Sequence, residues 1–388
     1  MSKIPGTFSN KLSNRFAFVD FLRFTAIVLM IQGHTFDALY TFPSEKLFTV
    51  DVYRFVHGLV APMFYFSSGF AFYVATRKKW DNFLYFSFPL QKRLARFLIL
   101  ILLGYMLHAP FFSFQKIMAE AQSSGLAAMF QVDTLQLIGV TLLCLQLLVL
   151  ILRTPKRFFM TTTILAGLII LATPFIWGID FGRVLPQAIA AYFNDKYQSF
   201  FPVFNWSAFL MLGATTGYLF MKSYEQQTVP LFMKQLSMVS AALIAGSLLL
   251  SLVPITIYPP HDFFKANPIF FAVRAGSIAL LTAGMWLLEQ QIRTPVRWIS
   301  IIGAESLAIY VAHLIVVYGS PLNPGLGAIL GKMFTLPSAT GLAIILIISM
   351  LLFGRLWYIM KSEYGRPSRF FQIATALVLL FIFFINEQ

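Results

Sequence analysis

Apolar runs of roughly 18 to 22 residues recur along this chain, and a helix of that length crosses about 30 Å of hydrocarbon. Peptide groups inside a bilayer find no water, so a segment that spans it must satisfy its own hydrogen bonds as a helix. The chain is 58% apolar and only 11% charged, whereas about 25% of the residues of a soluble domain are charged. We therefore predict an all-α fold, a polytopic transmembrane helix bundle.

The positions of the apolar runs predict about 10 to 11 spans within one integral-membrane domain over residues 1–388. The expected spans lie near residues 17–37, 55–76, 95–113, 131–152, 157–177, 203–221, 235–255, 268–289, 298–318, 337–356 and 370–386. Segment 319–336 is rich in Pro and Gly, and two interpretations stay open for it: a loop or a re-entrant piece.

Basic residues set the expected orientation of the bundle. If the N-terminus is cytoplasmic, most of the 29 Lys and Arg residues fall in cytoplasmic segments, as the positive-inside rule requires. The net charge of +14 then reflects topology, and we expect no nucleic-acid partner. Asp20 and Arg23 interrupt the first apolar run and no cleavage site follows it, so we interpret it as an uncleaved helix in a bacterial inner membrane.

The chain has a single cysteine, Cys144, inside an apolar run. One cysteine excludes a disulfide framework and a thiolate metal cluster, and we predict no metal site. Cys144 itself is expected to be a small core residue.

All five histidines fall at or near the expected outer face: His34, His57, His108, His261 and His313. His34 lies about 25 Å along the first expected span and His313 about 22 Å along the ninth. An ionisable group inside a span costs a few kcal/mol or more, so each is a functional-site hypothesis. For His108 and His261 the ordinary interpretation, an interfacial histidine, is favoured.

Nearby residues favour a functional role for His34 and His57. Asp37 follows His34 at i+3, a spacing that puts the carboxylate on the same helix face, where it can orient the imidazole. The alternative is an Asp in solvent at the helix end. His57 precedes small residues, Ser67 among them, that allow close helix approach or a broken helix, and the alternative is again an interfacial histidine.

Other charged and polar residues are candidates for binding a substrate or cofactor. Arg23 and Glu305 lie at a similar expected depth, roughly 10 Å from the cytoplasmic face. Either they form a buried ion pair, or Arg23 pairs with Asp20 at i−3, or Arg23 meets an anionic group of a substrate. Asp133 and Gln136 begin the fourth expected span near the outer face.

Several motifs resemble those of membrane acyltransferases. Arg23 and His34 in "VDFLRFTAIVLMIQGH", with Asp20 before them, resemble the first-helix R-x10-H motif of the acyltransferase 3 family, although Phe24 stands where that family usually has Gly. "VAPMFYFSSGFAFYV" resembles its second-helix pattern, and "GAESLAIYVAHLIV", with His313, its late-helix pattern. "VDTLQLIGVTLL" and "FPVFNWSAFLMLGATTGYLF" resemble the heparan-alpha-glucosaminide N-acetyltransferase-like proteins.

This resemblance implies transfer of an acyl group, with acetyl expected, from cytoplasmic acyl-CoA to a hydroxyl or amine of an extracytoplasmic glycan or glycolipid. The basic clusters "TRKKW", "QKRLAR" and "RTPKR", with Arg93 and Arg96, offer charge for the phosphates of CoA. The alternative for these clusters is topology and lipid headgroups of the surrounding bilayer. A homodimer stays open.

The mechanism that this resemblance implies has His34 as the general base, oriented by Asp37. His57, Ser67 or a helix terminus is expected to stabilise the oxyanion, and a two-step route through an acyl-histidine stays open. The rival hypothesis is a proton-coupled secondary transporter, which intramembrane ionisable residues also suit. No internal repeat of the transporter kind is evident in the sequence.

Overall fold

The computed structural model describes residues 16–43, 47–109, 112–119, 129–253, 257–292, 297–320 and 322–386. Within these residues the structure is helical, and its only β-type pairings are isolated bridges, Tyr40 with Phe334 and Ser320 with Asn323. The prediction of an all-α, polytopic fold is confirmed.

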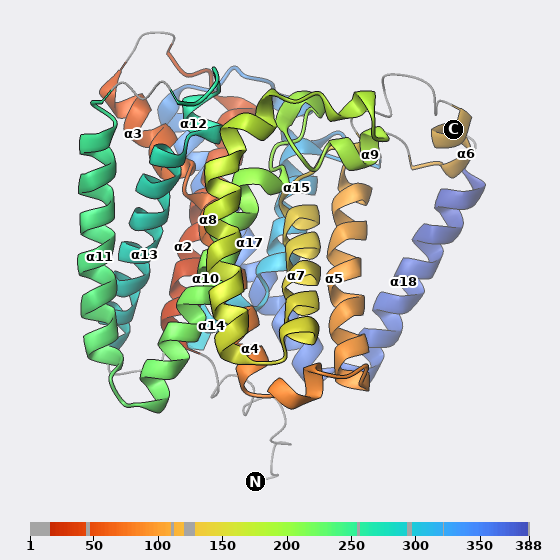
Figure 1. Ribbon diagram of the computed structural model, residues 1–388. Helices are drawn as coiled ribbons and strands as arrows, with labels where there is room; N and C mark the ends of the chain where they lie inside the picture. Colours follow the sequence, from red (N-terminus) through yellow and green to blue (C-terminus); the bar gives the residue numbers. More distant parts are fainter. Residues whose placement is uncertain are drawn as a thin grey trace. The chain divides into compact units, whose positions relative to one another are not determined.

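Ten helices of 18 residues or more make up most of the described chain (Figure 1). They are α2 (Ala17–Leu39), α4 (Val60–Arg77), α5 (Phe88–Leu107), α7 (Thr134–Leu152), α8 (Pro155–Gly178), α10 (Val203–Glu225), α11 (Val229–Leu250), α13 (Pro268–Gln291), α17 (Leu336–Glu363) and α18 (Gly365–Ile385). The shorter elements are α3 (Phe48–His57), η1 (Trp80–Phe83), α6 (Phe114–Ala119), η3 (Phe181–Arg183), α9 (Gln187–Ala190), η4 (Asp195–Tyr197), α12 (Phe263–Ala266), α14 (Arg297–Ala304), α15 (Ser306–Tyr318) and α16 (Gly325–Leu330).

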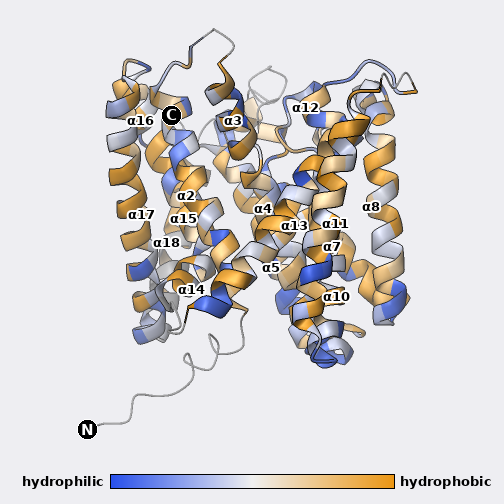
Figure 2. Cartoon of the chain, turned by 90° about the vertical axis from the view of Figure 1, so that its left-hand side faces the viewer, coloured by the Kyte–Doolittle hydropathy of each residue, from blue (hydrophilic) through white to orange (hydrophobic). Residues whose placement is uncertain are grey.

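Seven helices in the described residues are long and apolar enough to cross a membrane, with Phe48–Arg77 counted as one, or eight if α14 and α15 are one span bent by 70°. The expected spans at 55–76 and 298–318 fall on two helices each, α3 with α4 and α14 with α15, and the others fall on one each. Those at 95–113, 203–221 and 370–386 fall on α5, α10 and α18, which are not among the seven. Figure 2 shows α8 and α17 hydrophobic over most of their length, with hydrophilic residues near an end.

Segment 319–336 contains only the six-residue helix α16, which is too short to span a membrane. Three glycines, Gly319, Gly325 and Gly331, have φ values of 87°, 68° and 65°. A side chain is strained in that left-handed region, and an added Cβ at Gly325 would meet the backbone of Gly319. The described residues of this segment therefore turn sharply at these glycines, and the choice between a loop and a re-entrant piece stays open.

The chain divides into two compact units. The first unit comprises residues 1–60, 111–119 and 284–388, and the second comprises residues 61–110 and 120–283. The expectation of a single integral-membrane domain stays a prediction.

In the first unit α2 is the central helix, because it packs against α3, α14, α15, α16 and α17. Its N-terminus has no cap from its own flanking residue, Phe16. The Glu289 carboxylate instead accepts hydrogen bonds from the backbone N–H groups of Ala17 and Phe18, at 3.2 and 3.1 Å. A carboxylate there satisfies two free donors of the first turn and complements the positive end of the helix dipole.

In the second unit α10 packs against α7, α8 and α11, and α5 packs against α7. Helices α4 and α10 meet backbone to backbone, since an added Cβ at Gly69 would meet the Leu210 carbonyl and one at Gly213 would meet that of Phe66. Such small-residue contacts are typical of membrane helices. Cys144 on α7 is exposed, so its expected place in the core is wrong. An apolar residue of a spanning helix can face lipid as well as protein, which is why apolarity alone misplaced it.

Candidate functional site

Two predicted site histidines meet in the first unit. The ring centroids of His34, on α2, and His313, on α15, are 5.2 Å apart, and the ring of Tyr318 lies 5.4 Å from that of His34. His313 is fully buried. The packing of α15 against α2 therefore joins two histidines that the sequence places near opposite ends of the chain.

The third histidine, His57, packs against α2 beside His34. An added Cβ at Gly33 would lie 2.7 Å from His57 Nδ1, so the missing side chain at Gly33 makes room for the imidazole. The ring of Tyr53 lies 4.0 Å from that of His57, centroid to centroid. We call His34, His57, His313, Tyr53 and Tyr318 the histidine cluster.

The hydrogen bonding of His313 sets its protonation pattern. Its Nδ1 lies 3.1 Å from the carbonyl oxygen of Ile309. Because a carbonyl only accepts, Nδ1 donates the proton, and Nε2 of the neutral ring keeps its lone pair. Nε2 is buried and has no hydrogen-bond partner in the part of the chain that the structure describes. His313 thus presents an unprotonated nitrogen inside the cluster.

Asp37, the predicted orienting carboxylate, is exposed. Its charge interacts with His34 and with Lys332. The role of Asp37 in orienting His34 stays a prediction.

Two tyrosines of the cluster are absent from the predicted site residues. The Tyr53 hydroxyl is buried and has no hydrogen-bond partner among the described residues. Tyr53 precedes His57 by four residues on α3, a spacing that puts both on one helix face and could have indicated the pair from sequence. Tyr318 ends α15, and its meeting with His34 depends on how two distant helices pack.

Asp20 and Arg23 lie on the first turns of α2, where α14 passes close by. Asp20 is 1% exposed, and an added Cβ at Gly303 would lie 3.1 Å from its Oδ1. Phe24 packs edge-on against Trp298, with ring centroids 5.2 Å apart. The small residue at 303 and this aromatic pair hold α14 against the Asp20 end of α2.

Glu305 stands at the break between α14 and α15, and its partner is Lys361 of α17. Lys361 Nζ donates to both carboxylate oxygens, at 2.7 and 2.6 Å. The Glu305 side chain is 7% exposed and that of Lys361 is 38% exposed. Of the alternatives for Glu305, the structure therefore shows a pair with Lys361, because the packing of α17 against α14 and α15 brings Lys361 to the helix break.

In the second unit Asp133 and Gln136 form the N-terminal capping box of α7. Asp133 Oδ1 accepts from the backbone N–H of Thr134 at 2.7 Å, and Gln136 Oε1 accepts from that of Asp133 at 3.2 Å. Asp133 Oδ2 also lies 3.1 Å from His108 Nε2. These contacts account for both side chains through helix capping, and substrate binding by them stays a prediction.

Ser67, Arg93 and Arg96 also belong to the second unit. Ser67 is fully buried and its hydroxyl donates to the Phe64 carbonyl at 3.1 Å. Arg93 donates to the Thr76 hydroxyl at 2.8 Å and the Gln146 amide oxygen at 3.1 Å, and its guanidinium carbon lies 3.5 Å from the centroid of the Phe83 ring. Arg96 is exposed. Arg93 therefore links α5 to α4, α7 and η1, whereas the exposed Arg96 can contact a solvent anion or a headgroup.

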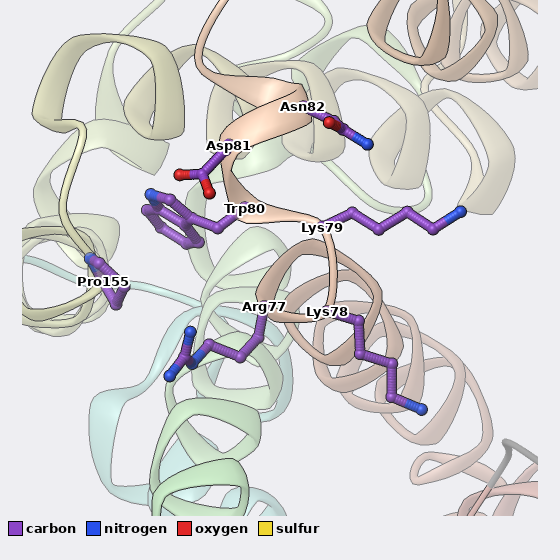
Figure 3. Close-up of a pocket in the computed structure, with 7 residues that line it drawn as sticks. All are labelled: Arg77, Lys78, Lys79, Trp80, Asp81, Asn82 and Pro155. Atoms are coloured by element: carbon purple, nitrogen blue, oxygen red, sulfur yellow. The ribbon is translucent and has the colours of Figure 1, made fainter.

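A pocket of about 430 Å³ opens at the "TRKKW" cluster. It is lined by Arg77, Lys78, Lys79, Trp80, Asp81, Asn82 and Pro155 (Figure 3). Arg77 forms an ion pair with Glu225 at 3.0 Å, and the Trp80 indole donates to the Arg153 carbonyl at 3.0 Å. Figure 3 shows Lys78 and Lys79 extending away from Trp80. Their ammonium groups thus remain at the rim of the pocket.

A family model for the catalytic region of heparan-alpha-glucosaminide N-acetyltransferase matches residues 15–255. The match includes Asp20, Arg23, His34 and His57, while His313 lies beyond its end. No curated protein matches the chain. Among the described residues no three His, Cys, Asp or Glu side chains are grouped to hold a metal ion.

Proposed function

The chain belongs to the heparan-alpha-glucosaminide N-acetyltransferase family and is an integral membrane protein, and from that premise we propose that it transfers an acyl group, acetyl first, from acyl-CoA to a hydroxyl or amine of a glycan or glycolipid. The observation that carries this proposal is the histidine cluster, which gathers imidazoles and phenols around the end of α2. The proposed setting is a bacterial inner membrane, with the N-terminus and the donor on the cytoplasmic side.

In the proposed reaction His34 acts as general base. It takes a proton from the acceptor hydroxyl or amine as the acceptor oxygen or nitrogen attacks the thioester carbonyl. The tetrahedral intermediate collapses, the carbon–sulfur bond breaks, and the CoA thiolate leaves with the proton that His34 held. The acyl group ends on the acceptor, and His34 returns to its neutral form.

Other members of the cluster are proposed to stabilise the oxyanion and to complete the proton path. The buried Tyr53 hydroxyl and His57, whose rings lie 4.0 Å apart centroid to centroid, are hydrogen-bond donors for the developing oxyanion. His313, whose unprotonated Nε2 lies in the same cluster as His34, is proposed as the second residue of the proton path. An acyl-histidine route would produce ping-pong kinetics, and direct transfer a ternary complex.

Each unit separately offers positive charge for donor binding, and the two places are alternatives. In the first unit Arg23 precedes His34 by roughly 16 Å along α2, a length that suits the pantetheine arm of CoA. In the second unit the rim lysines of the "TRKKW" pocket offer charge for the phosphates of CoA. Arg93 has its own protein partners and contributes by shaping this region.

The test measures CoA release from acetyl-CoA by the purified full chain in detergent, with glucosamine as the probe acceptor. His34→Ala should abolish release, whereas His261→Ala, a histidine bonded to Pro259 and Asn267 in the second unit, should leave it intact. Full activity in His34→Ala would exclude His34 as the general base. If the wild-type protein neither binds nor cleaves acetyl-CoA, the proposal fails and proton-coupled transport becomes the better use of the cluster.

A further inference from the structure

Four polar side chains in the second unit take no part in the proposed transfer. Asn205, Trp206 and Ser207 lie at the start of α10, and Arg274 lies on α13. Their exposures are 3%, 6%, 1% and 8%, so all four are more than nine-tenths buried. We call them the α10–α13 polar group.

Each of the four carries a buried atom that has no hydrogen-bond partner within the described residues: Asn205 Oδ1, Trp206 Nε1, Ser207 Oγ and Arg274 Nε. Buried polar atoms in native proteins are almost always paired, because an unpaired one loses its hydration without compensation. Four such atoms on two helices therefore indicate a partner outside the described residues.

The short helix α12 holds the group together. The Asn205 side-chain amide donates to the Lys265 carbonyl, and Arg274 Nη1 donates to the adjacent Phe264 carbonyl at 3.0 Å. The guanidinium carbon lies 4.4 Å from the Phe270 ring centroid and 5.6 Å from that of Trp206. Asn205 and Arg274 thus bond to adjacent carbonyls of α12, and the rings of Trp206 and Phe270 lie beside the guanidinium.

The charge of Arg274 has no partner of its own in the described residues, since none of their salt bridges includes it. The acidic residue that interacts with it is Asp262. Asp262 is exposed, and its Oδ1 already accepts from the backbone N–H groups of Phe264 and Lys265, at 2.8 and 3.1 Å. Lys265 in turn pairs with Asp195, at 3.2 Å. A buried guanidinium without a carboxylate calls for an anion.

The backbone at the start of α10 is also unusual. Asn205 has φ 79° and ψ −53°, and with Phe204 it breaks the helix. This region is rare and strained for a residue with a side chain, and such strain persists where the surroundings hold it, often at binding sites. The break places the Asn205 amide against α12, which lies with α9 at one end of the second unit (Figure 1).

We propose that the α10–α13 polar group binds a small hydroxycarboxylate. The guanidinium N–H of Arg274, the indole N–H of Trp206 and the Ser207 hydroxyl are donors, which suit the two oxygens of a carboxylate. Asn205 Oδ1 is the one unpaired acceptor of the group, and a hydroxyl on the ligand donates to it. The aromatic walls cover the carbon skeleton and exclude water, which strengthens the charged contacts.

The test is thermal unfolding of the full chain in detergent with lactate or glucuronate as probe, and with propane-1,2-diol or glucose as matched neutral compounds. A ligand that binds only the folded state raises Tm. Lactate or glucuronate should raise Tm and their neutral counterparts should not. Inorganic phosphate is the third arm: a shift with phosphate but with neither hydroxycarboxylate would overturn the assignment, as would no shift at all.

Variants locate the effect. Arg274→Gln should abolish the shift, and Trp206→Phe, which keeps the ring but removes the N–H, should weaken binding about five- to tenfold. Trp206→Phe serves as the decisive variant if Arg274→Gln fails to fold. Ser277→Ala is the control, because the Ser277 hydroxyl on the same helix donates to the Val273 carbonyl at 2.8 Å. An unchanged shift in Trp206→Phe and Arg274→Gln would overturn the proposal.

Discussion

The imidazole rings of His34 and His313 lie 5.2 Å apart, centroid to centroid, where α15 packs against α2. In the proposed reaction the two residues act together. The Nε2 of His313 is buried, keeps its lone pair and has no hydrogen-bond partner among the described residues.

We expect His34→Ala and His313→Gln each to lower kcat for acetyl transfer by about 10²- to 10³-fold, the size of a general-base contribution. Because the residues act together, the double variant should be little worse than the more severe single variant. Steady-state rates of all three variants, with His261→Gln as control, measure this. Fully multiplicative losses would show that the two histidines act independently.

Gly33→Ala should displace His57, because the new methyl group would sit 2.7 Å from His57 Nδ1. We expect kcat to fall while Tm changes little. Gly341→Ala is the matched control, since Gly341 is a helical glycine of the same unit with nothing near its Cβ position. There Ala should add up to about 1 kcal/mol of helix stability. Unimpaired kcat in Gly33→Ala would show that the position of His57 is unimportant.

Lys361→Met should destabilise the protein by about 1 to 3 kcal/mol, because it leaves the buried Glu305 carboxylate without its cation. The double variant Glu305→Gln with Lys361→Met should recover part of the loss, since no charge is then stranded. Thermal unfolding in detergent measures both. The exposed Arg77–Glu225 pair provides the contrast, and Glu225→Gln should change Tm very little. A Lys361→Met variant as stable as the wild type would contradict the role of the pair.

Asp133→Ala should lower stability by about 0.5 to 2 kcal/mol through loss of the α7 cap. Asp133→Asn keeps a capping oxygen, so it should retain most of the stability and the acetyl-transfer rate. Comparing Tm with kcat/KM separates capping from substrate binding. Loss of kcat/KM in Asp133→Asn at unchanged Tm would assign this carboxylate to the substrate instead.

Sequence by itself determined the elements of this protein. Peptide groups in a bilayer must bond within their own helix, so each long apolar run had to become helical, and the described residues of each expected span are mainly helical. It also placed Asp20, Arg23 and His34 on one helix, because neighbours within a helix follow from spacing alone. The same logic could have paired Tyr53 with His57.

Only the tertiary structure decided which helices meet. Helix rotation and packing paired Glu305 with Lys361. They also brought His313 and Tyr318 into contact with His34. Gly319, Gly325 and Gly331 have positive φ values, and both Asn205 and Arg274 donate hydrogen bonds to carbonyls of α12. Apolar runs encode length and depth in the membrane, but they do not encode which face of a helix turns toward which partner, because apolar residues suit both lipid and protein neighbours.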